Sequence, residues 1–584
     1  MILVFGGTTE GRKAVEVLEE GGSPYFYSTK TGEQDITLHH GHRIDGALDE
    51  EAMRSFCQEH DIRLMVDAAH PFASQLHQTI ARVSESQQIP VIRYERIYPE
   101  RDPHLEWIDD YAQIPPNIHT LLATTGVQSI AKLKPLEVQG VSIYYRILPR
   151  ESSMALAQKL GAKKEQLCFF EDGATINVEA EAILLKESGL SGGFMEKVEA
   201  AKAKGMRILV LKRPAINFEH SVNGPYGLRR AVEKLLPEFY PLHSGLTTGT
   251  CATAAAVAAT MRLLKKETPK EVPVLLPDGE TIYVAVSYGN DYASVFKDAG
   301  DDPDVTNGLE IRASVKPIPA DAPTHSLSDN FKILGGEGVG RFTLPGFDYP
   351  PGEAAINKAP REMIRQNLEP FDTPLQITIS VPEGAEIARR TFNPRLGIEG
   401  GISIIGVSGI VKPFSEEAFI DSIRKCMTVA QASGTERVVI NSGGKSERFV
   451  KALYPNLPQQ AFVEYGNYIG ETLKIANELS IKNVTLGVML GKAVKLAQGH
   501  LDTHSRKATM DKDFIKKMLQ ETGCDININD ITLARELWEK LPPNKLQPFA
   551  STIIHHCAEH CDPLLPNGYL TILLIDDEGH IYKE

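Results

Sequence analysis

Short apolar runs alternate with helical patterns from the beginning of the chain to about residue 238. Met1–Phe5 is an apolar run, and the Gly/Thr-rich turn after it leads into a segment with apolar residues at helical spacing. Strand, loop and helix in this order open a βαβ unit. Later apolar runs at 64–66, 141–147, 183–185 and 208–211 continue the alternation. The pattern predicts an α/β module over 1–238 with two Rossmann-like parallel-sheet halves, about 1–115 and 116–238.

A different pattern begins at 242–259, LHSGLTTGTCATAAAVAA, where a Gly/Thr turn opens into an alanine-rich helix. Thr247, Thr248 and Thr250 are N-cap candidates, and helix residues this small require close packing. An exposed helix N-terminus here would attract carboxylates; the alternative is a capped helix that is buried for packing alone. No glycine-loop Rossmann start is obvious beyond it. We therefore expect an α+β module of non-Rossmann type over 246–584, after a linker at 239–245.

Composition narrows the class of protein. A net charge of −14 and a pI near 5.7 argue against a nucleic-acid partner, because phosphates require a basic surface. Seven scattered cysteines indicate a reduced cytosolic protein, not a disulfide scaffold. No signal-peptide pattern and no apolar run of membrane-spanning length are present. We expect a soluble, cytoplasmic protein without a membrane partner, and the sequence leaves room for a homo-oligomer.

The first glycine-rich loop is a candidate cradle for a pyrophosphate. GGTTEGR departs from a dinucleotide fingerprint at Thr8, and it lacks the Lys-Ser/Thr of a P-loop at Arg12 and Lys13. The second strand ends in hydroxyls and a lysine, including Thr29, where an acidic residue would favour NADH. This end favours NADPH over NADH, unless it is only a polar loop. The loop residues expected to bind the cofactor are Gly6, Gly7, Thr8, Glu10, Gly11 and Arg12.

Ionisable groups follow several predicted strands of the first module. DAAHPFA (67–73) brings Asp67 and His70 to the carboxyl end of a strand, where parallel sheets bind ligands. His70 could donate a proton or a hydrogen bond, or could merely bond its own loop. Thr125, Lys186, Ser188 and Arg213 also follow strands in this module.

The second module contains further polar clusters. KDAGDDPDVTNG (297–308) gathers four aspartates that could bind a cation or share a proton, but the spacing is not that of an EF-hand and we expect no metal. GGEGVG (335–340) would allow close approach to a flat ligand or form a bulge. Arg395 could hold a carboxylate.

Two histidine-containing runs could bind a metal. In HLDTH, His500, Asp502 and His504 alternate and would share one face of a strand. In HHCAEHC (555–561), two histidines and two cysteines form i,i+4 pairs on a predicted helix. The alternatives are hydrogen bonds to a substrate carboxylate or within the protein for the first run, and a partly buried helix face for the second.

Several blocks, in one order, resemble known families. GLTTGTCATAAAVAA, KDAGDDPDVTNG, GGEGVGRFTLPGF, NPRLGIEGGISIIGVSGIVKPFS and GKAVKLAQGHLDTHSRK resemble the cobalt-precorrin-5B C1-methyltransferases. GGTTEGR, DAAHPFA, TTG, KESG and VLKRP resemble the precorrin-6A reductases. The product of the first family, cobalt-precorrin-6A, is the substrate of the second, so the two resemblances support each other.

The resemblances imply a bifunctional cobalamin-pathway enzyme acting on cobalt-corrinoid intermediates. It would methylate C1 of cobalt-precorrin-5B from S-adenosylmethionine and then reduce a C=C bond with NAD(P)H, yielding cobalt-precorrin-6B. They imply catalytic roles for His70, Lys186 and Asp301. S-adenosylmethionine is expected at Gly336 and Gly338, and at Gly443 and Gly444 in the turn after a predicted strand at 438–440, where GGKSE departs from the Asn-containing turn expected for the family. They also imply substrate contacts for Thr125, Ser188, Lys197, Arg213, Thr247, Thr248, Thr250, Arg395, Lys492, His504 and Arg506. The alternatives are a single active module, a nucleoside-diphosphate-sugar enzyme, and a non-catalytic cobalt or tetrapyrrole carrier built around HHCAEHC.

Overall fold

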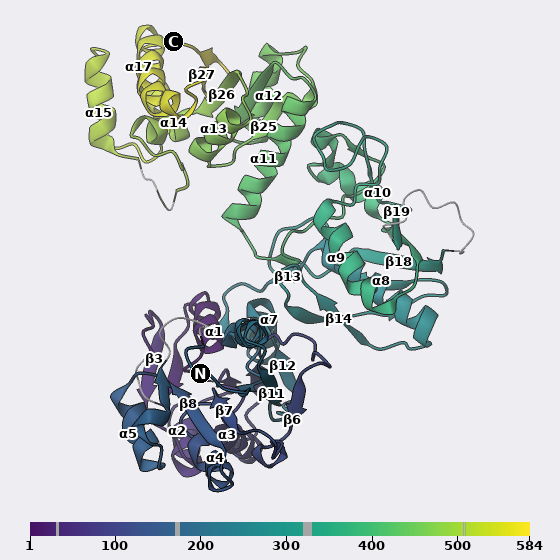
Figure 1. The fold of residues 1–584 in the computed structure, drawn as a ribbon. Coiled ribbons are helices and arrows are strands. Elements are labelled where there is room, and N and C mark those ends of the chain that lie inside the picture. Colours follow the sequence, from purple (N-terminus) through teal and green to yellow (C-terminus); the bar gives the residue numbers. More distant parts are fainter. Residues whose placement is uncertain (31–33, 170–175, 319–329, 506, 508–509) are drawn as a thin grey trace. The chain divides into compact units, whose positions relative to one another are not determined.

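A computed structural model describes residues 1–584 except 31–33, 170–175, 319–329, 506 and 508–509. The chain forms two compact units (Figure 1). Unit 1 comprises Met1–Ser244 and Leu275–Tyr283, and unit 2 comprises Gly245–Val274 and Val284–Glu584. Among the described residues, no helix is long and apolar enough to cross a membrane.

The first sheet of unit 1 has six parallel strands in the order β12-β5-β4-β1-β2-β3. The strand order reverses between β1 and β4, which is the point where doubly wound sheets bind ligands. The strands are β1 (Ile2–Phe5), β2 (Tyr25–Thr29), β3 (Gly41–Asp45), β4 (Leu64–Asp67), β5 (Val91–Tyr94) and β12 (His220–Val222). The accompanying helices are α1 (Thr9–Glu19), α2 (Glu50–Glu59), α3 (Ser74–Gln87) and α7 (Pro225–Leu235).

The second sheet of unit 1 repeats this plan in the order β6-β11-β10-β7-β8-β9, again with parallel neighbours. Its order reverses between β7 and β10. The strands are β6 (Glu106–Ile108), β7 (Thr120–Ala123), β8 (Ser142–Ile147), β9 (Leu167–Phe169), β10 (Ala182–Lys186) and β11 (Arg207–Leu211). The helices are α4 (Ser129–Val138), α5 (Glu151–Lys159) and α6 (Phe194–Ala203).

The two sheets exchange their edge strands. β6 lies in the expected first half of the module but pairs with β11, and β12 lies in the expected second half but pairs with β5. The division at residue 115 therefore does not follow the sheets, because the chain crosses to the second sheet before β6 and returns after β11. Such a return is set by long-range pairing and leaves no local trace in the sequence.

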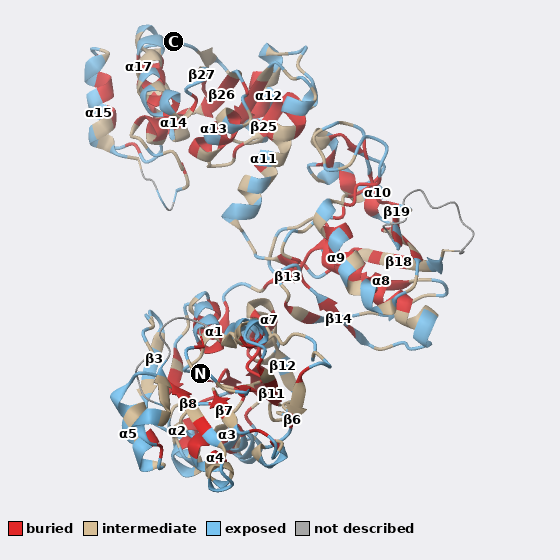
Figure 2. Cartoon of the chain, in the orientation of Figure 1, coloured by how far each residue is buried: buried red, intermediate tan, exposed pale blue. Residues whose placement is uncertain are grey.

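The first sheet of unit 1 is buried on both faces, which explains why its central strands are continuous apolar runs in the sequence. Every residue of β1 and β4 is buried, because apolar clusters cover the first sheet on both faces. Helices α1 and α7 pack on one face, and α2 and α3 on the other. The same contrast of buried strands and partly exposed helices is visible in Figure 2.

The first part of unit 2 is α+β, as expected. Its central sheet has the order β16-β17-β18-β21-β19 and is antiparallel except at the β19–β21 pair. Helix α8 (Thr248–Thr260) is buried along its whole length and packs against α9, β17 and β18, so the small alanine side chains serve close packing. The other elements are β16 (Ser287–Tyr288), β17 (Ala293–Phe296), β18 (Glu310–Pro317), β19 (Phe331–Gly335), β21 (Leu375–Ser380), α9 (Lys358–Leu368) and α10 (Gly384–Ile387).

Three small two-stranded sheets complete this part: β13 (Gly245–Leu246) with β23 (Ile410–Val411), β20 (Arg341–Phe342) with β22 (Ile398–Glu399), and β14 (Glu271–Leu275) with β15 (Thr281–Ala285). The turn between β14 and β15 belongs to unit 1.

The last part of unit 2 corrects the expectation of an α+β module throughout 246–584. Strands β25, β24, β26 and β27 are parallel neighbours in that order, and β28 joins the edge antiparallel. The order reverses between β24 and β26, which makes this a doubly wound α/β sheet. The strands are β24 (Arg437–Asn441), β25 (Phe462–Glu464), β26 (Asn483–Met489), β27 (Tyr569–Ile575) and β28 (Ile581–Tyr582). The helices are α11 (Glu416–Ala432), α12 (Gly444–Leu453), α13 (Ile469–Glu478), α14 (Leu490–Ala497), α15 (Lys512–Glu521), α16 (Leu537–Lys540) and α17 (Pro543–Cys561).

Candidate active sites

The first glycine loop lies at the point of strand reversal in unit 1, on the ring of Tyr27. A Cβ on Gly6 would overlap that ring, and one on Gly11 would lie 2.8 Å from the Tyr27 hydroxyl. Gly7 has a φ of +84° with open space beside it, and its N–H donates to the Tyr27 hydroxyl at 3.0 Å. The glycines therefore keep the loop close to the sheet and leave room on its outer side for a ligand.

Thr8 joins this loop to the neighbouring strand. Its hydroxyl caps α1 by accepting from the Gly11 N–H at 2.9 Å, and it donates to the Ala68 carbonyl at 2.7 Å. The loops after β1 and β4 thus form one surface, as parallel strands of this order require.

Glu10 is not open to a cofactor. Its side chain is 7% exposed and pairs with Arg96 at 2.9 Å, while Ser191 donates a hydrogen bond to its second oxygen. Arg96 also donates to the Ser188 carbonyl at 2.7 Å. Because Arg96 follows β5 and Ser188 follows β10, this buried network ties together the carboxyl ends of the two sheets. Arg96 lies in no local motif and was not predicted as a site residue.

Asp67, at the end of β4, has a structural role. It is fully buried and contacts His77 at 2.6 Å and Arg93 at 3.1 Å. Arg93 is itself 1% exposed and also donates to the Ala69 carbonyl at 3.0 Å. These contacts fix the loop that leads to His70.

His70 is neutral near pH 7. Burial, together with the nearby cations Arg96 and Lys186, lowers the pKa of His70 to about 3. Its Nδ1 accepts from the Phe72 N–H at 3.2 Å, so the neutral ring carries its hydrogen on Nε2. His70 can therefore donate a hydrogen bond from Nε2, but it does not serve as an imidazolium acid at neutral pH.

Lys186 has the properties of a proton donor. It ends β10, and its Nζ lies 4.9 Å from the ring centroid of Phe72, which is also 5.9 Å from the ring of His70. Burial, with a contribution from Lys132, lowers the pKa of Lys186 to about 8. A group with that pKa is protonated at neutral pH and can release its proton readily.

The other expected substrate contacts of unit 1 already have partners within the protein. The Thr125 hydroxyl donates to Ser129 at 2.7 Å, and Ser188 and Lys197 both donate to the Gly192 carbonyl. Arg213 bonds Glu187 at 2.9 Å, with its guanidinium 3.6 Å from the Tyr98 ring centroid.

The end of β2 is polar, but an acidic group stands beside it. Thr29 donates to Asp45 at 3.0 Å, and Asp45, which ends β3, also pairs with Arg43 at 3.0 Å. Asp45 was not predicted as a neighbour of Thr29, because strand pairing brings the two together. Arg12 is exposed next to the glycine loop.

The threonine turn of unit 2 is an internal anchor, so the alternative of a buried, capped helix is the correct one. Thr247 caps α8 by accepting from the Thr250 N–H at 3.2 Å. The Thr248 hydroxyl accepts from the Ile405 N–H at 2.8 Å, and the Thr250 hydroxyl donates to the Gly409 carbonyl at 2.6 Å. All three threonines are buried, which leaves no exposed helix N-terminus for a carboxylate.

The aspartate cluster has a counterion inside the protein. Lys297 is 2% exposed and pairs with Asp304 at 2.7 Å, and this cation outweighs burial and lowers the pKa of Asp304. Asp302 accepts from the Phe414 N–H at 3.0 Å, whereas Asp301 is exposed. Of the groups in the described part of the chain, the cluster spaced to hold a metal lies elsewhere, at Asp576, Glu578 and His580.

Gly336 and Gly338 permit close packing of the protein against itself. A Cβ on Gly338, which has a φ of +70°, would overlap the Val381 carbonyl, and one on Gly336 would overlap the Ser380 hydroxyl. Both glycines thus accommodate the end of β21. Their geometry gives no support to S-adenosylmethionine binding there.

A second glycine loop lies at the point of strand reversal in the last sheet. Asn441 ends β24, is fully buried, and accepts from the Gly443 N–H through its side-chain oxygen at 3.2 Å. Gly443 has a φ of +148°, and a Cβ on Gly444 would meet nothing within 4 Å. A Cβ on Gly443 would lie 3.4 Å from a carboxylate oxygen of Glu464, which ends β25. The loop is therefore open at Gly444, and the Glu464 carboxylate lies beside Gly443.

Further polar residues gather at this edge of the sheet. Lys492, just after β26, donates to the Gly466 carbonyl, and burial lowers its pKa to about 8. Arg395 bonds Glu447 of α12 at 2.7 Å. The backbone of Asp502 forms an isolated antiparallel β-bridge with Tyr468, and the His504 N–H donates to the Asp502 side chain at 3.0 Å. Arg506 lies outside the described residues.

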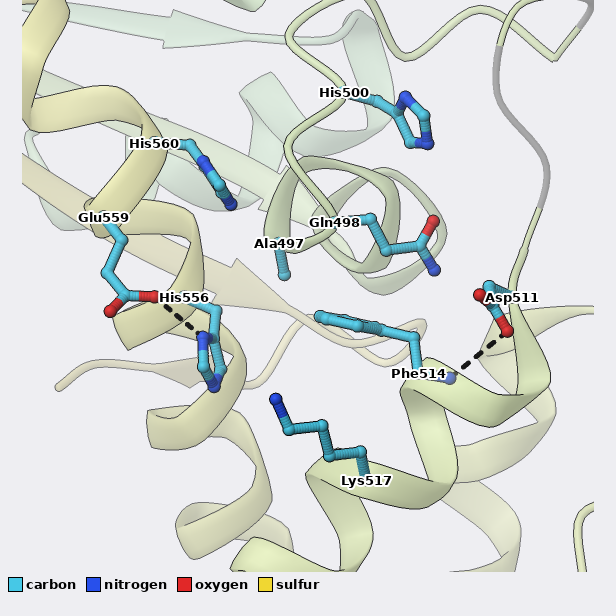
Figure 3. A pocket seen from close by; sticks show the side chains of 9 residues that line it. All are labelled: Ala497, Gln498, His500, Asp511, Phe514, Lys517, His556, Glu559 and His560. Atoms are coloured by element: carbon cyan, nitrogen blue, oxygen red, sulfur yellow. Dashed lines mark hydrogen bonds and ion pairs between the residues drawn. The ribbon is translucent and has the colours of Figure 1, made fainter.

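The HHCAEHC run is divided between two faces of α17. Cys557 and Cys561 are buried in the core, where the Cys557 thiol donates to the Ala493 carbonyl at 3.3 Å. His556 and His560 line an open pocket of about 690 Å³ together with His500 (Figure 3). His556 bonds Glu559 at 2.9 Å and Glu521 at 3.0 Å. The thiols and imidazoles of HHCAEHC therefore point to different faces of the helix, and the run is not a preformed metal site.

Comparison with known proteins assigns the two regions. The family model for precorrin-6x reductase CbiJ/CobK matches residues 1–225, and the CbiD family model matches residues 237–413. A cobalt-precorrin-5B C(1)-methyltransferase of Prosthecochloris aestuarii is 40% identical over 350 residues, covering 57% of this chain and 94% of that protein. One of Geobacillus kaustophilus is 42% identical over 293 residues, covering 48% of this chain and 77% of that protein.

Two solved structures also match. The cobalamin biosynthesis protein CbiD from Archaeoglobus fulgidus is 29% identical with a TM-score of 0.26, covering 48% of this chain and 85% of that one. CobK precorrin-6A reductase is 18% identical with a TM-score of 0.34, covering 40% of this chain and 97% of that one. From its sequence relatives, the chain belongs to the cobalt-precorrin-5B C(1)-methyltransferase family, and ahead of that region it carries a region that the precorrin-6x reductase family model matches.

Proposed function

We propose that this protein is a bifunctional enzyme of cobalamin biosynthesis. Unit 2 methylates C1 of cobalt-precorrin-5B, using S-adenosylmethionine, and unit 1 reduces the resulting cobalt-precorrin-6A to cobalt-precorrin-6B. The observation that carries this proposal is the succession of two family regions in one chain, each with a glycine loop at the point of strand reversal of a parallel sheet.

In unit 1 the residues at the strand reversal fit a nicotinamide dinucleotide. Gly6 and Gly7 leave the outer side of the loop free for a pyrophosphate, and Arg12 adds a cation beside it. We assign NADPH as the reductant because Thr29 ends β2, and the acidic Asp45, which ends β3, is already paired with Arg43. The nicotinamide, when bound, supplies the hydride.

The protein's own contribution to reduction is orientation and a proton. Lys186 holds a proton on Nζ at neutral pH. We assign Lys186 as the donor of this proton to the macrocycle carbon next to the carbon that receives the hydride. His70 presents an Nε2–H to the substrate as a fixed hydrogen-bond donor. The Glu10–Arg96 ion pair holds the carboxyl ends of the two sheets of unit 1 together, and so orients the cofactor relative to the substrate.

In unit 2 the loop at 441–444 fits the methyl donor. It is open beside Gly444 and lies at the edge where Lys492 and Arg395 offer cations to carboxylates of the macrocycle. S-adenosylmethionine, when bound, supplies the methyl group. Methyl transfer to carbon depends on alignment and on exclusion of water, so the residues of this edge serve to position the two reactants.

The test is an anaerobic incubation of the purified protein with cobalt-precorrin-5B, followed by mass spectrometry. S-adenosylmethionine alone should add one methyl group, and further addition of NADPH should add two hydrogens. Gly7→Asp should abolish only the second change, because its carboxylate would repel the pyrophosphate. Gly22→Asp is the matched control, since Gly22 is also left-handed (φ +66°) with open space beside it. Loss of both activities in Gly7→Asp would contradict two separate sites.

A further inference from the structure

Glu464 lies at the end of a strand of the last sheet, next to the strand that leads into the glycine loop. β24 is the first strand, the glycine loop 441–444 follows it, and β25 is the second strand, paired parallel with β24. Glu464 ends β25, roughly 20 residues after the glycine loop, which is the spacing at which doubly wound sheets place an acidic residue that binds a ribose hydroxyl.

The side chain of Glu464 is directed to the glycine loop and is not engaged elsewhere. Its Oε1 lies 3.4 Å from the position of a Cβ on Gly443. Across the described ranges, no side chain or backbone N–H donates to its carboxylate. The nearby cations form their bonds with other groups in this structure: Arg395 pairs with Glu447, and Lys492 donates to the Gly466 carbonyl. A half-buried acceptor without a donor is costly unless a ligand supplies one.

The two glycine loops of this chain therefore select different ligands. In unit 1 the nearby Glu10 is neutralised by Arg96, so that loop can admit a diphosphate. In unit 2 the loop faces the unpaired Glu464, which would repel a phosphate but accept hydrogen bonds from hydroxyls. A positively charged nucleoside without phosphates fits such a site.

We propose that Glu464 binds the ribose 2′- and 3′-hydroxyls of the methyl donor and thereby selects an adenosyl sulfonium over a nucleotide. This inference rests on the proposed methyltransferase function of unit 2. Two carboxylate oxygens match two vicinal hydroxyls, and the neighbouring Gly444, beside which a Cβ would meet nothing within 4 Å, leaves room for the nucleoside next to the carboxylate.

The test is the affinity of Glu464→Gln for S-adenosylhomocysteine and for its 3′-deoxy analogue, measured by isothermal titration calorimetry. Glu464→Gln should weaken binding of the parent compound about 10- to 100-fold, as for loss of hydrogen bonds to a charged group. The wild type should bind the analogue more weakly than the parent, whereas the variant should bind both alike. Glu471→Gln is the matched control, because the side chain of Glu471, on the adjacent α13, is 46% exposed and pairs with Lys474.

The outcomes separate this inference from the proposed function. Unchanged affinity in Glu464→Gln, or a deoxy penalty that persists in it, overturns the role of Glu464 while the methyltransferase function stands. A wild type that neither binds S-adenosylhomocysteine nor methylates overturns both. Retained reductase activity shows that unit 1 is intact, and circular dichroism shows whether the variant folds. If it does not fold, Glu464→Asp, which keeps the charge but shortens the side chain, should show the same loss of affinity.

Discussion

The ion pair between Glu10 and Arg96 should be a major determinant of the stability of unit 1. Both side chains are almost fully buried, 7% and 6% exposed, and they contact at 2.9 Å. Replacing either one alone leaves the other charge buried without its partner, which costs about 3–5 kcal/mol of unfolding free energy. Replacing both with apolar side chains of similar length removes both charges from the interior, so the double variant should lose less than either single one.

The assay is urea denaturation of Glu10→Leu, Arg96→Met and the double variant. The chain has two tryptophans, so in a Trp538→Phe background Trp107 fluorescence reports unit 1 alone. Arg82→Met is the control, because Arg82 forms an exposed pair with Glu50 and its loss should cost less than about 1 kcal/mol. The reasoning is refuted if both single variants lose under about 1 kcal/mol, or if the double variant loses the sum of the two.

Three further predictions concern pH. Reduction should slow as pH rises above about 8, where Lys186 loses its proton. Lys186→Met should lower the rate by about 10²–10⁴ and abolish this loss at high pH, whereas Lys212→Met, at a partly buried lysine that pairs with Asp109, should change neither. His70→Ala should slow reduction without altering the pH profile between 6 and 9, since the pKa of His70 is about 3; a lost limb there would contradict its assignment as a neutral donor. Burial raises the pKa of Glu280 to about 7, so its contribution to stability is fully present below pH 4.5 and is lost as pH rises through 7. Denaturation of unit 1 as a function of pH should show this loss, and Glu280→Gln should remove it.

Features with a local cause could be predicted from the sequence. The loop at Gly6–Thr8 is required where β1 turns directly into α1, and its glycines are visible without knowledge of the fold. The alanine-rich α8 was predicted as a closely packed helix for the same reason, since small side chains alone dictate it. The resemblance to the two families could be recognised because several sequence blocks occur in one order along the chain.

Features that depend on distant partners could not be predicted. Arg96 is recognisable only once it is paired with Glu10, 86 positions away in the chain. Asp45 acquires its place beside Thr29 through the β2–β3 register. The doubly wound sheet of unit 2 was missed because its loop, Asn441-Ser-Gly-Gly, lacks the usual glycine spacing, although the strand before it was predicted. The position of Glu464 beside the glycine loop could not be predicted, because it depends on the pairing of β25 with β24.

The turn between β14 and β15 limits how this chain can be divided. Residues 275–283 belong to unit 1, although they lie beyond the sequence that matches the reductase family. Within unit 1, the carboxylate of Glu280 accepts hydrogen bonds from the backbone N–H groups of Tyr226 and Gly227 at the start of α7. A gene cut between codons 244 and 245 would remove that cap and expose the first turn of α7. Unit 1 is therefore complete only with nine residues from beyond the reductase-like region, and a stand-alone reductase fragment would need a substitute for them.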